Sequence, residues 1–441
     1  MFQYSYLFCW LLIEMSYQIA KGVFDILPED PDPKGNWRSS SYWQHVEKVI
    51  REISEEFGFE EIRTPLFEKS ELFTRSIGAT SDIVTKEMYT FLDKGGRSMT
   101  LRPEGTAPVM RSFIEKKLHL QKPVSKFYYL FPMFRYERQQ AGRYRQHHQF
   151  GVEAIGIASP YQDAEVIILL YSFLKRLGIQ GLTLHLNSIG DESCRELYRL
   201  QLQNILRPHL QELSPESALR FESNPLRILD SKDPKDQQFL TKVPSIMDFL
   251  GKEERTHFET LCHLLSIEGV PFHINPKLVR GLDYYNRTVF EVTSKELGAQ
   301  DSLGGGGRYD SLIESLGGPS IPSVGFGAGL ERIIQTMLAQ HAFLPSPSPT
   351  KLYLIPLGEE AKEKCFELLC NLREKRIPAQ MDFSDKKLKN AMRIADSIKA
   401  QYVAIIGEEE LKSGQIVLKE MKTGQTETHS IDQITEIFKH V

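Results

Sequence analysis

The stretch Phe131-Pro-Met-Phe-Arg-Tyr-Glu-Arg138, followed after three residues by Gly142-Arg-Tyr-Arg-Gln-His-His-Gln-Phe-Gly-Val-Glu153, alternates polar residues with aromatic and apolar ones. Successive residues of a β-strand point to opposite faces, so Arg135 and Glu137 share a face, as do Gln149, Gly151 and Glu153 on the next run. The pattern predicts an antiparallel hairpin of two strands, residues 127–136 and 147–155. Its polar face would present guanidinium and carboxylate groups, which suit a polyphosphate held beside a zwitterionic small molecule.

The composition is that of an ordinary soluble protein, with 41% hydrophobic and 25% charged residues among 441. This length predicts two or three domains. The net charge of −4 argues against binding nucleic acid through bulk positive charge, although local patches can still read RNA. The five cysteines form no Cys-x-x-Cys pair, which favours reduced thiols and no metal site.

The first fifteen residues are apolar but lack the positive start and the small-residue cleavage site of a signal peptide. They are also too short to cross a bilayer. We therefore expect no membrane segment, and we interpret residues 1–20 as an N-terminal extension, with Met15 as an alternative initiator. A membrane anchor is the less favoured alternative.

Changes of texture along the chain predict its domains. Residues 21–342 carry mixed strand and helix patterns, interrupted by a charged, helical insertion at residues 191–268. A proline- and serine-rich linker at residues 343–350 follows. Alternating strands and helices over residues 351–441 then predict a small α/β domain.

Two glycine-rich runs have two open interpretations. Gly304–Gly307 lacks the Lys-Ser/Thr of a phosphate-binding loop, and Gly325–Gly329 lacks dinucleotide-binding spacing. They are either tight turns and closely packed backbone, or a surface against which a flat ligand lies.

Several charged residues stand in apolar or glycine-rich settings, where an unpaired charge is rarely found. These are Arg135, Arg143, Arg280 and Arg332, together with the loops Arg102-Pro-Glu-Gly-Thr106 and Leu278-Val-Arg-Gly-Leu-Asp-Tyr-Tyr285. A surface position is the alternative for each arginine, and a solvated turn for the first loop. The sequence shows no spacing typical of a catalytic nucleophile.

Taken together, these motifs resemble bacterial-type histidyl-tRNA synthetases, a family of class II aminoacyl-tRNA synthetases, from Gly22 to the C-terminus. Residues 59–81 resemble motif 1, with Pro65 at a dimer interface; residues 134–153 resemble motif 2, and residues 325–332 motif 3. The loops at 102–106 and 278–285 resemble the two histidine-specific signatures. The resemblance implies an α+β fold: a class II antiparallel sheet flanked by helices, with a helical insertion and a C-terminal α/β anticodon-binding domain.

The resemblance also implies residue roles. Arg135 and Arg280 would be catalytic, and ATP would be bound by Arg135, Glu137, Arg143 and Arg332. Histidine would be bound by Glu104, Gly105, Thr106, Gln149, Glu153, Arg280, Tyr284 and Tyr285. Arg138 and Gln140 would meet the acceptor end of the tRNA. One position departs from the family: His147 stands where a phenylalanine usually stacks on adenine.

The implied activity is that of a histidine–tRNA ligase, which forms histidyl-adenylate from histidine and ATP and then charges its tRNA. The implied partners are the histidine tRNA, ATP accompanied by Mg²⁺, and a second copy of the chain in a cytoplasmic homodimer. One alternative is the synthetase-like regulatory subunit of ATP phosphoribosyltransferase, which lacks the anticodon domain and usually the ATP-binding arginines. Another is a prolyl or threonyl synthetase, which lacks the signature at residues 278–285.

Overall fold

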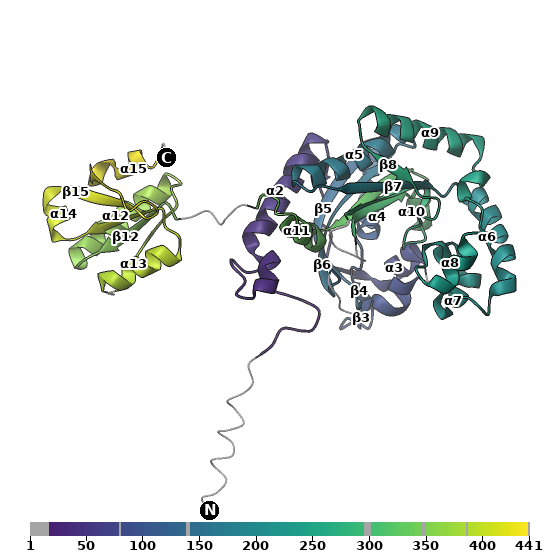
Figure 1. Ribbon diagram of the computed structural model, residues 1–441, viewed down its shortest axis with the longest axis horizontal. Helices are drawn as coiled ribbons and strands as arrows, with labels where there is room; N and C mark the ends of the chain where they lie inside the picture. Colours follow the sequence, from purple (N-terminus) through teal and green to yellow (C-terminus); the bar gives the residue numbers. More distant parts are fainter. Residues whose placement is uncertain are drawn as a thin grey trace, which may run out of the picture. The chain divides into compact units, whose positions relative to one another are not determined.

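The structure, a computed structural model, describes residues 17–78, 81–137, 142–294, 301–344, 350–384 and 387–439. The chain forms two compact units that divide after Leu344 (Figure 1). The predicted linker therefore falls at the division, and its residues 345–349 lie outside the described ranges, as do residues 1–16 of the expected extension.

The first unit is built on one large, mostly antiparallel sheet, and the expected class II fold is confirmed. Across the sheet the strands are β1 (Glu60–Glu61), β5 (Ser125–Phe134), β6 (Gln146–Ile155), β11 (Ser323–Gly329), β10 (Ser302–Arg308), β9 (Asn286–Ser294), β7 (Leu182–Ser188) and β8 (Phe272–Ile274). Only the two edge pairs, β1–β5 and β7–β8, are parallel.

The predicted hairpin is β5 and β6, which pair antiparallel with Phe131 opposite Gln149 and Phe127 opposite Glu153. The first strand ends earlier than predicted, at Phe134. Beyond it the chain turns to another segment, because the Tyr136 amide donates to the Glu87 carbonyl. Arg135 and Glu137 therefore lie just past the end of the strand. At the start of the motif 1 region only the two residues of β1 form a strand, which pairs with β5 at the edge of the sheet.

The two glycine-rich runs lie inside the central strands β10 and β11, so tight turns are the wrong interpretation. The strands approach too closely for side chains: a Cβ on Gly306 would lie 1.9 Å from the Gly325 carbonyl oxygen. At neighbouring positions the missing side chains leave room for polar groups, one from the loop 278–285 and one from β6. A Cβ on Gly305 would lie 2.8 Å from Arg280 Nη1, and one on Gly325 would lie 2.2 Å from Glu153 Oε2.

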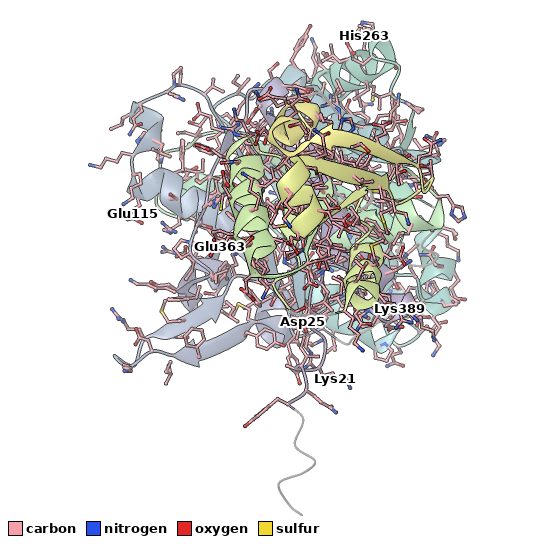
Figure 2. All side chains as sticks on the ribbon, turned by 90° about the vertical axis from the view of Figure 1, so that its left-hand side faces the viewer. Lys21, Asp25, Glu115, His263, Glu363 and Lys389 are labelled. Atoms are coloured by element: carbon pink, nitrogen blue, oxygen red, sulfur yellow. The ribbon has the colours of Figure 1, made fainter. Side chains whose placement is uncertain are left out.

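Helices cover the sheet with their apolar faces. Fully buried residues on these faces are Leu170 and Phe173 of α5, and Ile333 and Ile334 of α11. The helices are α2 (Ser40–Glu56), α5 (Pro160–Arg176) and α11 (Leu330–Ala339), preceded by η1 (Pro33–Arg38). Their outward faces are polar; Figure 2 shows His263 of α9 (Lys252–Ile267) pointing away from the body.

A small sheet lies beside the large one and carries the motif 1 region. Its strands are β2 (Phe67–Lys69), β4 (Ser98–Leu101) and β3 (Tyr89–Leu92), and it is accompanied by α3 (Ser70–Ile77), η2 (Ile83–Glu87), α4 (Thr106–Glu115), η3 (Leu118–Leu120) and α10 (Leu312–Ser315). Buried Arg102 joins the two sheets, donating to the carbonyls of Thr64 and Pro132.

The predicted insertion is helical, as the sequence indicates. It contains α6 (Glu192–Leu206), η4 (Arg207–His209), α7 (Pro215–Ser223), η5 (Pro225–Asp230), α8 (Pro234–Leu240), η6 (Ile246–Phe249) and α9. Helices α6 to α8 gather at one side of the unit, near α3 (Figure 1). Helix α9 instead packs Phe258, Leu261 and Leu265 into the core beside α5. Helices α6 to α8 also join the core, because Tyr198 and Phe221 lie in one buried cluster with residues of β5 and α4.

The second unit is a five-stranded sheet with helices. Its strands in order are β13 (Ala379–Met381), β12 (Leu352–Pro356), β14 (Tyr402–Ile406), β15 (Gln415–Glu420) and β16 (Thr426–Ser430), of which the first three are parallel. Its helices are α12 (Glu359–Glu374), α13 (Leu388–Ser397), α14 (Glu408–Ser413), η8 (Ile431–Gln433) and α15 (Ile434–Ile437). Glu363 and Lys389 mark the exposed faces of α12 and α13 in Figure 2.

Candidate active site

Four arginines from distant parts of the chain converge on one cavity. Arg135, Arg143, Arg280 and Arg332 all line a cavity of about 180 Å³. Its floor is formed by glycines of β10 and β11, including Gly304 and Gly327. Because a guanidinium keeps its charge at any physiological pH, the cavity carries fixed positive charge suited to phosphate oxygens.

Arg280 is held in place from the side of the sheet. Its Nη1 donates to Glu291 Oε1 at 3.0 Å, and the same carboxylate oxygen accepts from Ser302 Oγ at 2.7 Å. Burial disfavours the charged guanidinium, but the Glu291 carboxylate outweighs burial and raises the pKa of Arg280. Since Gly305 has no side chain, the guanidinium lies against the strand.

The other arginines are held by backbone carbonyls and one carboxylate. Arg332 donates to the carbonyls of Gly142 and Ser302, at 3.0 and 3.1 Å, and Arg135 donates to the Pro103 carbonyl at 2.8 Å. Arg143 Nη1 lies 3.2 Å from Glu137 Oε2. Burial, reinforced by the charge of Arg143, lowers the pKa of Arg332. The like charges repel one another, so an anion placed between them is attracted by both.

A second, smaller cavity of about 150 Å³ adjoins the first, since Arg135, Arg280, Gln149, Gly305 and Gly327 line both. Its other polar lining residues are Glu104, Thr106, Tyr284 and Tyr285. Seven of the residues expected to bind histidine or ATP therefore meet in one small space. The two tyrosines are almost fully buried, with ring centroids 4.7 Å apart.

Glu104 sits at the start of helix α4. Its Oε2 accepts from the Thr106 amide at 2.6 Å and its Oε1 from the Ala107 amide at 2.8 Å. These amides are among those that a helix leaves unpaired at its N-terminus, so the carboxylate is fixed in direction. Burial nevertheless raises its pKa. An ammonium group in the cavity would give the Glu104 carboxylate a further hydrogen-bond donor and an opposite charge. Gly105 does not line the cavity; it packs against Tyr129, which a Cβ would overlap.

Glu153 lies one layer behind the small cavity. It is 1% exposed and accepts hydrogen bonds from Thr106 Oγ1 at 2.7 Å, from the Tyr129 hydroxyl at 3.3 Å and from the Tyr309 hydroxyl. Burial raises the pKa of Glu153 to about 8, although the three hydroxyl donors oppose the rise. The carboxyl group therefore holds its proton near neutral pH and can exchange it with a basic ring.

His147 lines the larger cavity among the arginines. Burial, together with the positive charge of Arg135, lowers the pKa of His147 to about 3. The imidazole is therefore neutral at physiological pH and presents an uncharged ring to a ligand. Its neighbours are supported by an aromatic cluster: the Tyr144 ring lies 5.2 Å from Trp37, and His148 lies 4.8 Å from Trp43.

A wider cleft of about 1120 Å³ lies between the arginine cavity and the insertion. Arg135, Arg143 and Arg332 line it on one side, and Arg220 and Lys232 of the insertion line it on the other. The residues expected to meet the tRNA acceptor end, Arg138 and Gln140, lie outside the described residues.

Several residues of this site were not predicted from the sequence. Tyr309 follows the tetraglycine at strand spacing from Gly305 and Gly307, so alternation along β10 could have placed it on the ligand face. Glu291 and Ser302 meet only through pairing of β9 with β10. Buried Glu331, which accepts from the His148 amide and ring, shows no signal beyond its place beside Arg332.

Among the described residues no three His, Cys, Asp or Glu side chains are grouped so that they could hold a metal ion. Within the same ranges, no helix has the length and apolarity needed to cross a membrane.

Comparison with known proteins agrees with this geometry. A family model described as histidyl-tRNA synthetase matches residues 36–333, and one described as an anticodon binding domain matches residues 351–440. The chain is 57% identical to the histidine–tRNA ligase of Protochlamydia amoebophila, covering 97% of this chain and all of that one. It is 49% identical to that of Chlamydia felis, covering 96% and 97%.

Among solved structures, the apo histidyl-tRNA synthetase of S. aureus superposes with a TM-score of 0.81 at 36% identity, covering 96% of this chain and 99% of that one. Identity at this level along nearly the whole chain, with both domains matched, leaves one conclusion. The chain belongs to the histidyl-tRNA synthetase family of class II aminoacyl-tRNA synthetases.

Proposed function

We propose that this chain is a histidine–tRNA ligase whose adenylation centre is the pair of cavities joined at Arg135 and Arg280. The observation that supports this centre most strongly is the convergence of four arginines on one cavity beside a small polar pocket. The regulatory-subunit alternative expects neither those arginines nor the anticodon-binding domain, and both are present.

The first step joins two anions. A carboxylate oxygen of histidine attacks the α-phosphorus of ATP, a new C(O)O–P bond forms, and the bond to the β-phosphate oxygen breaks to release pyrophosphate. Guanidinium groups lower the barrier because they stabilise the negative charge that accumulates on the phosphoryl oxygens. In the second step a ribose hydroxyl at the tRNA 3′ end attacks the carbonyl carbon, and AMP leaves.

Each arginine has a role in this proposal. Arg135 binds the α-phosphate, and Arg143 and Arg332 bind the outer phosphates, with Glu137 orienting Arg143. Arg280 bridges the histidine carboxylate and the α-phosphate, since it lines both cavities. Mg²⁺ bound with ATP would neutralise the outer phosphates. Among the carboxylates that line the wide cleft, Glu137 and Glu291 would be candidate ligands, in keeping with the few protein ligands that Mg²⁺ takes beside phosphates.

The small pocket would select histidine by hydrogen bonds at both ends. Glu104, Thr106 and Gln149 hold the α-ammonium, and Tyr285 and Glu153 hydrogen-bond the imidazole nitrogens, with Tyr284 as a wall. Because Glu153 lies behind Thr106, its contact with the imidazole requires the Thr106 hydroxyl to move aside. A side chain without ring nitrogens leaves buried polar groups unpaired, at about 1–3 kcal/mol each.

Two macromolecular partners follow from the same proposal. The histidine tRNA would place its acceptor end near Arg138 and Gln140, and residues 351–441 would bind its anticodon in the cytoplasm. A second copy would cover the apolar face near Pro65, where Leu66, Phe67, Phe91 and Leu92 are exposed on the small sheet.

Charging of histidine tRNA with labelled histidine tests the proposed function. The full chain should form acid-precipitable histidyl-tRNA only when ATP and Mg²⁺ are present. Arg135→Ala should lose this activity, whereas Arg97→Ala, an exposed arginine of the small sheet, should retain it. A wild-type chain that consumes ATP with histidine but charges no tRNA would contradict the ligase assignment.

A further inference from the structure

Asp283 stands in the histidine signature, yet the proposed mechanism gives it no task. It lies between Arg280, Tyr284 and Tyr285, all of which line the small cavity, but Asp283 itself does not. Its carboxylate turns the other way. Oδ1 accepts from Asn224 Nδ2 of the helical insertion at 2.6 Å.

The rest of this loop is held from the same side. Arg195 Nη1 donates to the Tyr285 carbonyl at 2.6 Å, and Arg227 Nη1 donates to the Gly281 carbonyl at 2.9 Å. All three donors belong to the insertion. Residues 278–285 form no helix or strand of their own, so nothing in the local backbone fixes their course.

The packing around Asp283 leaves little freedom. Gly78, with φ +99°, closes helix α3 directly against it, and a Cβ there would lie 2.3 Å from Asp283 Oδ2. The Asp283 amide also points at the Ile77 carbonyl. Burial raises the pKa of Asp283, while the charges of Arg227 and Arg195 oppose the rise.

We propose that Asn224, Arg227 and Arg195 of the helical insertion are positioning residues for histidine, because they hold the loop 278–285 whose side chains form the histidine pocket. This inference rests on the proposed function of that pocket. None of the three lines the small cavity, although Arg227 lines the wide cleft. They act through backbone carbonyls and through Asp283, so a change in the insertion reaches Arg280 and Tyr285 without a change in either side chain.

The Asn224–Asp283 pair offers the cleanest test, because its two polar groups can be exchanged. In the full chain, Asn224→Ala should raise the KM for histidine in ATP–pyrophosphate exchange about 10- to 150-fold, the loss expected for a hydrogen bond to a charged group. The KM for ATP should change less than about twofold. Asn224→Asp should do more harm, since it sets two carboxylates together.

The double variant Asn224→Asp with Asp283→Asn should restore the KM for histidine to within about threefold of wild type, because the amide then donates in the opposite direction. Gln203→Ala is the matched control. It removes an amide hydrogen bond within the insertion, to the Phe221 carbonyl, and should leave both KM values unchanged.

The inference is overturned if Asn224→Ala leaves the KM for histidine at the wild-type value, or if it raises both KM values equally and the exchanged pair restores neither. Should Asn224→Ala fail to fold, Arg227→Ala asks the same question through the Gly281 carbonyl. Wild-type exchange reports on the proposed function separately. If wild type shows no exchange, the proposed function is wrong. The ratio of the variant's KM for histidine to that of wild type tests only the role of the insertion.

Discussion

Gly327→Ala should move one side chain of the histidine pocket and little else. A Cβ at Gly327 would lie 1.5 Å from Gln149 Nε2 and 2.7 Å from its Cδ, and the three nearest atoms all belong to the Gln149 side chain. The amide must therefore leave its place, while the backbone can stay. Losing its proposed hydrogen bond to the substrate ammonium should remove about 1.5–3 kcal/mol, which would raise the KM for histidine about 10- to 150-fold.

ATP–pyrophosphate exchange and a thermal melt together check this prediction. The KM for ATP and the melting temperature should remain near wild type, since alanine is tolerated in a strand at least as well as glycine. Gly329→Ala is the matched control for the KM for histidine: it lies in the same strand but lines the arginine cavity, and a Cβ there meets no protein atom within 4 Å, so Gln149 keeps its place. Adding Gln149→Ala to Gly327→Ala should cost nothing beyond Gln149→Ala alone. A double variant whose KM for histidine is tenfold higher than that of Gln149→Ala would refute the steric explanation.

Three further outcomes follow from the charges of the site. Arg280→Ala should reduce exchange by at least about 100-fold, because it leaves developing phosphoryl charge unopposed; near-normal exchange would contradict its role. Because the folded pKa of Glu153 is about 8, above its ordinary 4.5, the stability it contributes is lost as pH rises from about 4.5 through 8. Between pH 5.5 and 8 the melting temperature of Glu153→Gln should therefore decrease less than that of wild type. Equal decreases in the two proteins would refute the raised pKa of Glu153. With its pKa near 3, His147 should add no pH dependence to the KM for ATP, so the KM values of wild type and His147→Phe should change in parallel from pH 6 to 8; a midpoint near 6.5 in wild type alone would show that the ring titrates there.

Strand alternation predicted the core of the site because it is a property of neighbouring residues. The run through Gln149 and Glu153 placed both side chains on one face, and β6 has that register against β5. The helical insertion and the α/β alternation of the second unit were equally visible, since each shows in local periodicity.

What the sequence could not reveal depends on pairing across the sheet. The tetraglycine has a turn-like composition, and only its position between β9 and β11 explains it as strand packed too tightly for side chains. The same pairing brings Ser302 to Glu291 and so fixes Arg280. The burial of Glu153 behind Thr106 depends on Tyr129 and Tyr309, which come from two different strands or their ends.

The role of the insertion at the histidine loop was likewise hidden. Asn224 is one of many polar residues in a charged helical segment, and its partner lies 59 residues away. Contacts of that kind follow from how the insertion packs against the loop in one shared core, which no local pattern records.

The central claim is that this site activates histidine and no other amino acid. ATP–pyrophosphate exchange by the full chain, measured with each of the twenty amino acids in turn, tests it most directly. Exchange should appear with histidine and stay at background with proline, threonine and the rest. Exchange that is absent with histidine, or equally fast with another amino acid, would contradict the account.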